Sequence, residues 1–254
     1  MEGEFPLKPV RDFPAALAGK TLVLADLHIG IEREYWRMGI RVSGLSRKAR
    51  ELVERVLDVT NPKRIVIAGD LKHNIPDFTR KEAQEVQSIF SLLEGQGEVI
   101  IIKGNHDGDL EAILPRATIV PGSGIKIGRI FYFHGHAWPD PEIFEADIAV
   151  MGHIHPAITL KHAFWSYTDK CWVFTKLVGE RLAKRYENAR DLPLVVLPAF
   201  SPIITGSNVL DESQWIGPIG ENKVFEIPFD VFLLDGTYVG KMCPSPQGGT
   251  HPGG

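Results

Sequence analysis

Seven of the nine histidines in this chain fall inside or beside short clusters that are rich in glycine and aspartate. In chain order the five clusters are Asp26-Leu27-His28, Gly69-Asp70, Gly104-Asn105-His106-Asp107, His134-Gly135-His136 and Gly152-His153-Ile154-His155. Carboxylate oxygen, amide oxygen and imidazole nitrogen form a mixed donor set that suits Mn, Fe, Co or Zn better than Ca or Mg alone. Two such ions about 3.5–4 Å apart activate water and hold both the attacking and the leaving oxygen of an in-line displacement at phosphorus. The clusters therefore predict a two-metal site that hydrolyses a phosphate ester.

Each cluster lies at the end of, or just after, an apolar run that predicts a buried β-strand. These runs are residues 20–26, 64–68, 98–102, 129–134 and 147–151. Ligands of open α/β sheets bind beyond the carboxyl ends of the strands, so five strands are expected to deliver polar groups to one edge. Any one cluster alone has an ordinary explanation as a turn or a strand end, but all five in this order point to a shared site.

Two amphipathic stretches separate the first three strands. The first begins at Ser46, repeats apolar residues on one face, and ends before Pro62. The second is expected to be capped by Asp77 or Thr79 and to run to about Glu94. The resulting β-α-β-α-β order predicts a parallel sheet wrapped by helices.

The second half of the chain is expected to add antiparallel hairpins and one more helix. Further strands are predicted at residues 125–127, 157–160, 194–197 and 231–234, with a closing hairpin near 238–241 and a helix over 176–186. We expect one α/β domain over residues 1–243 and a disordered tail over residues 244–254, because the tail is rich in Pro and Gly and lacks apolar residues.

The composition is that of an ordinary globular domain, with 44% hydrophobic and 24% charged residues. A net charge of −4 argues against a dedicated duplex-binding domain and confines any nucleic-acid contact to the active-site face. The two cysteines lie far apart, which fits a reducing, cytoplasmic setting. We expect no secretory leader and no membrane contact, because no apolar run approaches the roughly 18 residues that a span requires.

The motif order D-x-H, GD, GNH[DE], strand-end His and GHxH resembles that of the calcineurin-like metallophosphoesterase superfamily, over roughly residues 15–210. More narrowly, four segments resemble the prokaryotic subgroup of Icc-like phosphoesterases, some of which are described as ligase-associated DNA-damage-response nucleases. These segments are GDLKH at 69–73, HGHAWPD at 134–140, GHIHPA at 152–157 and LPAFSPIITG at 197–206. The resemblance implies a four-layer α/β/β/α sandwich with a dinuclear metal site at the strand C-termini.

The resemblance also implies a ligand set for two divalent ions, with Mn²⁺ expected and Fe, Co, Zn or Ni as alternatives. The first ion would be held by Asp26, His28, Asp70 and His155. The second ion would be held by Asp70, Asn105, His134 and His153. In this assignment Asp70 is the shared carboxylate, since each of its two oxygens can bind one ion, and a hydroxide between the ions is the nucleophile.

His106 resembles the catalytic histidine of the superfamily, which as an imidazolium stabilises the transition state or protonates the leaving oxygen. Asp107 is expected to hydrogen-bond His106 and set its tautomer, with a helix cap as the equally weighted alternative. His136 is expected to lie behind the metal ligands or to face the phosphate. His73 stands where many members have Asp, and we place it at the edge of the site.

Arg41 lies in a Gly-punctuated loop after the first motif and is a candidate for phosphate recognition, with Trp36 as a candidate for base stacking. An exposed helix with a core-facing aromatic is the favoured interpretation of this loop. The segment Phe164–Arg190 is the least typical stretch, and we expect it to form a lid or the contact of a homodimer.

The most direct functional interpretation is a phosphodiesterase that acts on a nucleotide or on nucleic acid, single-stranded nucleic acid included. A phosphomonoesterase, including a protein phosphatase, is the enzymatic alternative. A scaffold that keeps the fold without turnover is the third hypothesis, and the intact ligand set together with His106 argues against it.

Overall fold

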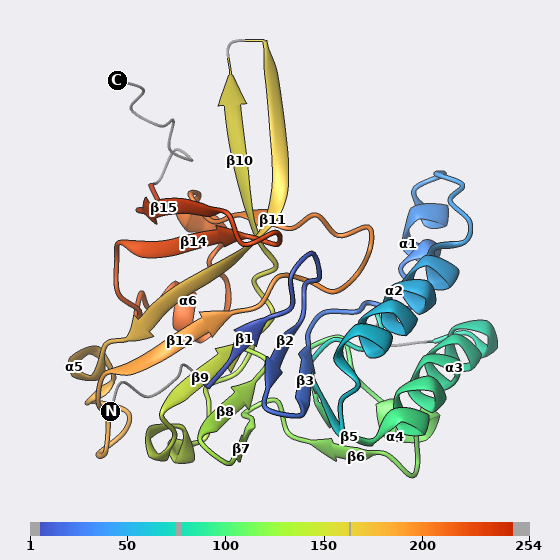
Figure 1. The fold of residues 1–254 in the computed structure, drawn as a ribbon, viewed down its shortest axis with the longest axis horizontal. Coiled ribbons are helices and arrows are strands. Elements are labelled where there is room, and N and C mark those ends of the chain that lie inside the picture. The colour runs from blue at the N-terminus through green and yellow to red at the C-terminus, as the bar shows by residue number, and fades with distance from the viewer. Residues whose placement is uncertain (1–5, 75–77, 163, 246–254) are drawn as a thin grey trace.

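Two β-sheets packed against each other form the centre of the molecule (Figure 1). The computed structural model describes residues 6–74, 78–162 and 164–245. Within these residues the first sheet has six strands, in the spatial order β1 (Lys8–Pro9), β2 (Ala16–Ala18), β3 (Thr21–Leu24), β4 (Arg64–Ala68), β5 (Glu98–Ile102) and β6 (Thr118–Val120). The strands from β3 to β6 are parallel, as the β-α-β-α-β pattern predicts.

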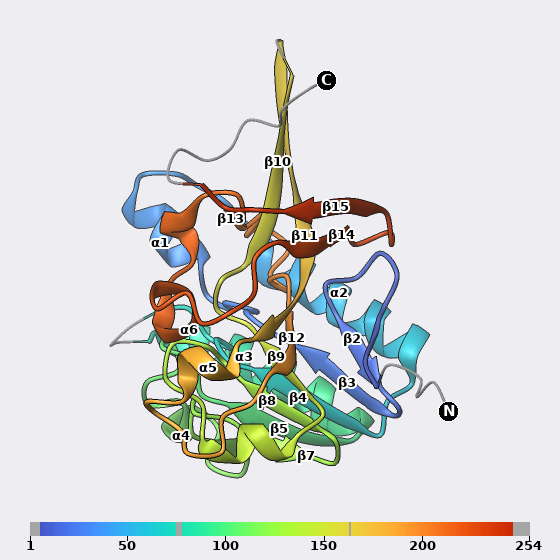
Figure 2. The same cartoon turned by 90° about the vertical axis from the view of Figure 1, so that its left-hand side faces the viewer.

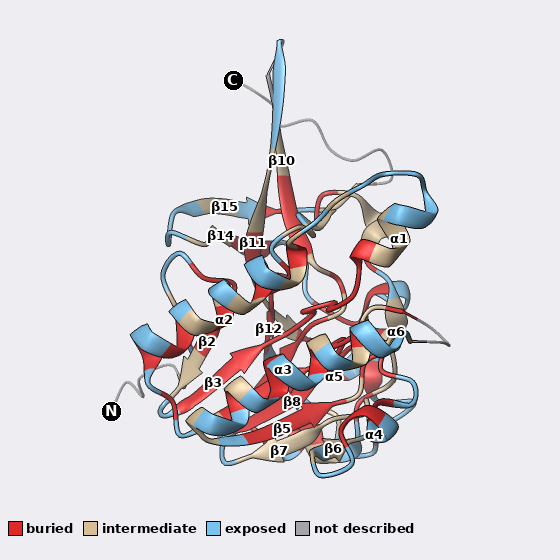
Figure 3. Cartoon of the chain, turned by 90° about the vertical axis from the view of Figure 1, so that its right-hand side faces the viewer, coloured by how far each residue is buried: buried red, intermediate tan, exposed pale blue. Residues whose placement is uncertain are grey.

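Two long helices, α2 (Leu45–Thr60) and α3 (Arg80–Gln96), make the crossovers between these parallel strands. Each buries one apolar face against the first sheet, while its outer face is exposed (Figure 3). The Thr79 side chain accepts a hydrogen bond from the backbone N–H of Glu82, which confirms Thr79 as the cap of α3. The alternative cap, Asp77, lies outside the described residues.

The second sheet combines parallel and antiparallel pairs. Its main path runs β13 (Ser207–Asn208), β10 (Pro156–His162), β11 (Trp165–Leu177), β12 (Leu192–Val196), β9 (Ile148–Met151), β8 (Ile130–Phe133) and β7 (Ile125–Ile127). Two further strands, β14 (Phe229–Leu233) and β15 (Tyr238–Met242), extend from β11. The strands β8, β9 and β12 lie parallel to one another, so their carboxyl ends point the same way.

Alternating residues of the strands divide the apolar side chains among three cores. In β3, Leu22 and Leu24 face the helices, whereas Val23 packs between the two sheets. A third core covers the outer face of the second sheet beneath η1 (Pro141–Glu145), α5 (Gly179–Leu182) and α6 (Gly217–Glu221). The fold is therefore the predicted α/β/β/α sandwich, with a fourth layer of short helices. The remaining described helices are α1 (Glu32–Arg37), α4 (Leu110–Ile113) and η2 (Glu212–Gln214).

The helix predicted over residues 176–186 is wrong. Strand β11 continues through Leu177, which pairs with Leu192 of β12, and the following helix α5 has only four residues. Leu177, Leu182 and Tyr186 are all buried in the outer core, so their spacing imitates the apolar stripe of a helix. Pairing of Lys176 and Leu177 with β12 overrides the start of this local pattern, because strand formation depends on neighbours that are distant in sequence.

Strands β10 and β11 form a hairpin that projects from the body of the molecule (Figures 1 and 2). Strand β10 starts at Pro156, directly after the GHxH cluster, and is longer than the predicted 157–160. Near the outer end of the hairpin, Phe164, Trp165 and Tyr167 are exposed. None of the described helices is long and apolar enough to cross a membrane.

Candidate metal centre

The five polar clusters meet at the carboxyl ends of β3, β4, β5, β8 and β9, as the sequence predicts. Five of the seven predicted ligands have a left-handed backbone, which lets the chain turn sharply as it leaves each strand. They are Asp26 (φ 57°), His28 (φ 49°), Asp70 (φ 52°), His153 (φ 72°) and His155 (φ 49°). Such conformations cost free energy in L-residues and are typical of functional sites that the surrounding fold holds in place.

The first cluster consists of Asp26, His28, Asp70 and His155, and one ligand atom from each lies within 4.8 Å of the others. His28 Nε2 lies 3.6 Å from Asp70 Oδ2 and 3.2 Å from His155 Nε2. His155 Nε2 in turn lies 3.3 Å from Asp26 Oδ1. These four residues match the set predicted for the first ion.

The second cluster consists of Asp70, His134 and His153, again with ligand atoms within 4.8 Å of one another. His134 Nε2 lies 3.3 Å from Asp70 Oδ2 and 3.2 Å from Asn105 Oδ1. The Nδ1–H of His134 donates to the carbonyl oxygen of Ala68 at 2.9 Å, so Nε2 is the nitrogen that faces the cluster. Metal-binding histidines are commonly oriented by such a bond from the other ring nitrogen.

The two clusters share Asp70, and together they contain all seven predicted ligands once Asn105 is included. Asp26, Asp70 and His134 are buried, so their polar atoms are largely removed from water. Buried carboxylates that face imidazole nitrogens form a donor set of the kind that divalent transition-metal ions prefer. The residues therefore fit metal binding.

The protonation of the centre is set by burial and by opposing charges. Burial raises the pKa of Asp70, but the charge of His134 and its hydrogen bond outweigh this and hold that pKa below its usual range. Burial lowers the pKa of His134, yet Asp70 and Asp26 raise it to about 9. Burial dominates at His28 and His153, where it lowers the pKa to about 2 and about 3. The raised pKa of His134 favours an imidazolium beside the Asp70 carboxylate in the metal-free protein, and metal binding at Nε2 requires loss of that proton.

His106 lies beside the first cluster. Its backbone N–H donates to Asp70 Oδ1 at 2.8 Å, and its ring centroid is 4.9 Å from that of His28. The partner of its Nδ1 is the backbone carbonyl of His73. The bond fixes the His106 ring with Nε2 as the nitrogen free to exchange a proton with another group.

The expected hydrogen bond between Asp107 and His106 is wrong. The Asp107 carboxylate is buried and accepts from the backbone N–H groups of Gly104 at 2.9 Å and Lys72 at 3.1 Å. Its side chain does not cap α4 either, since the residue that precedes this helix is Asp109. Asp107 instead fixes the turn that carries Asn105 and His106. Its carboxylate accepts one hydrogen bond from the loop after β4 and one from the loop after β5, and so ties the two loops together.

The three remaining candidates differ in how near they lie to the clusters. His73 is at the edge of the site, with ring centroids 5.1 Å from those of both His28 and His106. His136 packs behind His134 at 5.2 Å, and within the described structure its buried Nδ1 has no hydrogen-bond partner. Arg41 is exposed in the loop after α1, where it lines a hollow together with Trp36 and none of the histidines or aspartates of the clusters.

Three further residues contact the site and were not predicted from sequence. The buried Lys72 side chain donates to the carbonyl oxygen of His106 at 2.6 Å, and it could have been suspected from its place in GDLKH. Lys170 donates from Nζ to the carbonyl oxygen of Ala199 at 2.6 Å, at the loop that pairs with Asp26 through Ser201. Glu34 of α1 contacts His73. Lys170 stands far from any of the five clusters, and Glu34 lies six residues after His28 with no pattern that marks it.

The family model for calcineurin-like phosphoesterases matches residues 19–196 of this chain. That match spans more than half of the sequence, and the chain belongs to the calcineurin-like phosphoesterase family. The predicted superfamily is thereby confirmed. Family and site together define a metal-binding phosphoester hydrolase.

Among solved structures, the chain is similar to the nuclease MPE of Pseudomonas putida, with a TM-score of 0.56 and 19% sequence identity over 90% of this chain and 97% of that chain. It is also similar to YfcE, a phosphoesterase from E. coli, with a TM-score of 0.43 and 15% identity over 87% of this chain and 97% of that chain. At this identity the likeness to the nuclease shows a common fold. No curated protein matches the sequence.

Replacement of Gly104 by alanine should damage the site. An added Cβ would lie 2.0 Å from Asp70 Oδ1 and 2.4 Å from the Asp70 backbone nitrogen. We expect Gly104→Ala to destabilise the protein by about 1–3 kcal/mol, as overpacking does, and to weaken metal binding. Urea unfolding and metal titration of the chelated protein measure the two effects.

Gly108→Ala is the control, because none of the described atoms lies within 4 Å of its added Cβ. Equal behaviour of the two variants would contradict the proposed packing.

The metal-free protein should lose stability as pH falls below about 6.5. The unfolded chain gains protons at His28 and His153 near that pH, whereas the folded chain resists protonation until about pH 3 at His153 and about pH 2 at His28. Each histidine adds up to about 1.4 kcal/mol per pH unit to the slope. His134 acts in the opposite direction. Its raised pKa stabilises the folded protein at low pH, and this stabilisation is lost as pH rises from about 6.5 to about 9. Unfolding of chelated protein across this range measures both slopes. An acid slope that is unchanged in His28→Asn would rule out the account.

Proposed function

We propose that this chain is a dinuclear, metal-dependent phosphodiesterase that acts on nucleic acid or nucleotides in the cytoplasm. One observation carries the proposal: Asp70 belongs to both donor clusters, and its Oδ2 faces both His28 Nε2 and His134 Nε2. A carboxylate in that position can bind two ions at once. The mixed oxygen and nitrogen donors suit Mn²⁺, Fe, Co or Zn, and of these we propose Mn²⁺.

Asp26, His28, Asp70 and His155 would hold one ion, and Asp70, Asn105, His134 and His153 would hold the other. Two bound divalent cations supply positive charge for the phosphate oxygens and lower the pKa of water. The protein contributes the spacing of the donors, because the ligands come from five strand ends that the fold fixes.

His106 is positioned to protonate the leaving group. The bond from its Nδ1 to the His73 carbonyl leaves Nε2 free, and the Lys72 ammonium donates to the His106 carbonyl oxygen. A proton on Nε2 would be given to the ester oxygen as the phosphorus–oxygen bond breaks. The ring lies next to His28, so this transfer would take place beside the first cluster.

The surroundings of the site support a diester with nucleobases more than a simple monoester. The β10–β11 hairpin begins one residue after His155 and exposes Trp165 and Tyr167. Exposed aromatic rings at the outer end of this hairpin can stack bases of a single strand that extends away from the site, without sequence preference. One solved structure with the same fold is that of a nuclease, which supports this substrate class.

Hydrolysis of two chromogenic esters tests the proposal. Chelated protein supplied with Mn²⁺ should turn over bis-p-nitrophenyl phosphate faster than p-nitrophenyl phosphate, because the site is proposed to accept a phosphate with two ester arms. Faster turnover of the monoester would favour a phosphomonoesterase. Absence of turnover with both ions bound would favour the scaffold hypothesis and contradict the proposal.

Removal of the His106 imidazole should slow the reaction according to the leaving group. General acid–base residues typically contribute about 10²–10⁴-fold to the rate. His106→Ala should therefore lose a factor in that range with an alkyl leaving group, which needs a proton, and much less with p-nitrophenolate, which does not. Metal stoichiometry serves as the control and should stay unchanged. An equal rate loss with both leaving groups would exclude the acid role.

A further inference from the structure

We propose that Glu34 and His73 form a positioning pair that fixes the tautomer of His28 and so presents Nε2 of His28 to the first metal ion. The inference rests on the metal-dependent function proposed above, and it assigns to helix α1 a part in building the site. His28 lies in the first cluster, His73 lies directly behind it, and Glu34 lies beyond His73 on α1.

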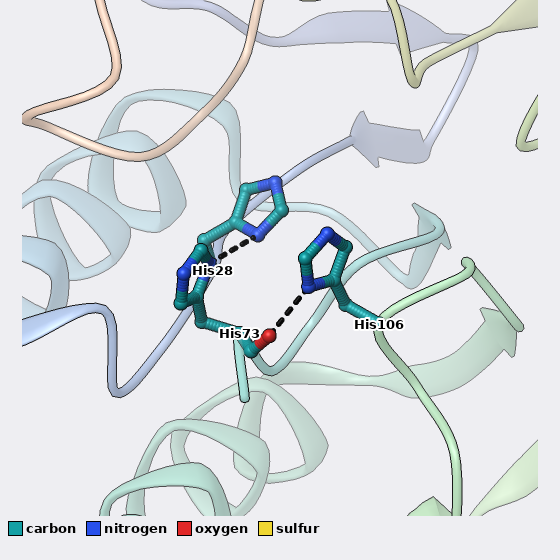
Figure 4. A group of neighbouring side chains, drawn as sticks. All are labelled: His28, His73 and His106. Carbon is teal, nitrogen blue, oxygen red and sulfur yellow. Dashed lines mark hydrogen bonds between the residues drawn. The ribbon is translucent and has the colours of Figure 1, made fainter. Parts of the chain in front are cut away.

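The contacts form a chain from the helix to the cluster. Nε2 of His73 contacts the Glu34 carboxylate. On the other side of the ring, Nδ1 of His73 lies 3.1 Å from Nδ1 of His28, the contact that Figure 4 marks. The two imidazole rings meet edge to face, with centroids 5.1 Å apart and an interplanar angle of 68°. The other nitrogen of His28, Nε2, faces Asp70 and His155.

The Glu34 carboxylate, at the outer end of this row of hydrogen bonds, determines which atom donates in each of them. An ionised carboxylate can only accept a hydrogen bond, so the Nε2 of His73 must carry the proton. A neutral His73 then has a lone pair on Nδ1, and His28 must donate its Nδ1–H to it. With that proton on Nδ1, the Nε2 lone pair of His28 is free for a metal ion.

The same logic applies to His134 in the second cluster, where the carbonyl of Ala68 takes the Nδ1–H directly. Within the described structure, Nδ1 of His28 faces a second histidine, with a carboxylate behind it, in place of a backbone carbonyl. Each cluster thus contains one histidine whose tautomer is set from outside the ligand set.

His73 also contacts the other side of the site. Its carbonyl oxygen accepts from His106 Nδ1, and its ring stacks on that of His106 at 5.1 Å and 17° (Figure 4). One residue therefore orients a proposed metal ligand with its side chain and the proposed acid with its backbone. A carboxylate at position 73 could accept from His28, but it has no proton to donate to Glu34. It could therefore not replace the His73 ring between these two residues.

Glu34 can act in this way because α1 is held in place at its start. The neighbouring Glu32 carboxylate accepts from the backbone and the side chain of Ser46, each at 2.9 Å. The Asn74 side chain donates to the carbonyl of Gly30 at 3.0 Å, which ties the start of α1 to the loop that carries His73. The Glu34 side chain is 44% exposed, so it acts from the rim of the site.

A rival arrangement uses the same residues. His28, His73 and His106 offer ligand atoms within 4.8 Å of one another, which is close enough to hold an ion of their own. In that case His73 Nδ1 would bind metal and would not accept a proton from His28. Metal stoichiometry separates the two arrangements, because a three-imidazole site would add one equivalent that disappears with His73.

Histidine tautomers in the chelated protein provide the first readout. Long-range ¹H–¹⁵N NMR at a pH where free imidazole is neutral should show Nδ1–H for His28 and Nε2–H for His73. Glu34→Ala should convert His28 to a mixture of tautomers, because nothing then fixes the proton on His73. Glu34→Gln should retain the wild-type pattern, since the amide oxygen also accepts from Nε2–H.

Metal affinity provides the second readout. Glu34→Ala and His73→Ala should each weaken the first ion by about 10–100-fold, as loss of a residue that orients a ligand does. Their combination should cost little more than either alone, because the two residues act as one unit. Glu51→Gln is the matched control, a charge-neutralising change on the adjacent helix α2.

Several outcomes overturn the inference. They are an Nε2–H tautomer for His28 in the wild type, unchanged affinity in Glu34→Ala, or a third metal equivalent that is lost in His73→Ala. Each of these readouts is independent of hydrolysis. A protein that shows the predicted tautomers and affinities but cleaves no phosphodiester would therefore contradict the proposed function and leave this inference intact.

Discussion

The buried carboxylate of Asp70 is the constraint on which the rest of the site depends. It lies between His28 and His134 and also accepts the backbone N–H of His106, so both clusters and the proposed acid meet at one residue. A charge removed from water is costly unless it is paired. In the metal-free protein His134 lies beside this carboxylate, and Asp70 raises the pKa of His134 and so favours the charged partner. The site is therefore arranged around a negative charge that metal ions can neutralise in place of the His134 imidazolium.

The surrounding fold keeps this arrangement in place before any ion binds. Parallel strands bring the ligands to one edge, and left-handed turns direct them inward. Asp107 and the buried Lys72 then join the loops after β4 and β5 through backbone contacts. The proposed pair of Glu34 and His73 extends the same principle to α1. Residues outside the ligand set thus fix the backbone of the loops that carry the ligands and determine which ring nitrogen each of the oriented histidines turns toward the ions.

Much of this could be predicted from the sequence, because the ligands follow buried strands whose apolar runs are unambiguous. Strands 64–68 and 98–102 agree with the structure at both ends. Contacts between distant segments were not predictable: Glu34 reaches His73 across 39 positions, and Asp107 bonds to Lys72 across 35. The helix expected over 176–186 failed for the same reason, since pairing with β12 decides the conformation of Leu177. Local patterns identify donors, whereas hydrogen-bond partners depend on the completed fold.

The central claim is that Asp70 joins two metal ions in one centre. Titration of Mn²⁺ into the chelated protein, followed by electron paramagnetic resonance, tests it directly. The account predicts two bound equivalents and an exchange-coupled spectrum at saturation, because ions that share a carboxylate lie about 3.5–4 Å apart. This coupling should vanish in Asp70→Asn. A spectrum of isolated Mn²⁺ ions at saturation, or a coupled spectrum that survives in Asp70→Asn, would contradict the claim.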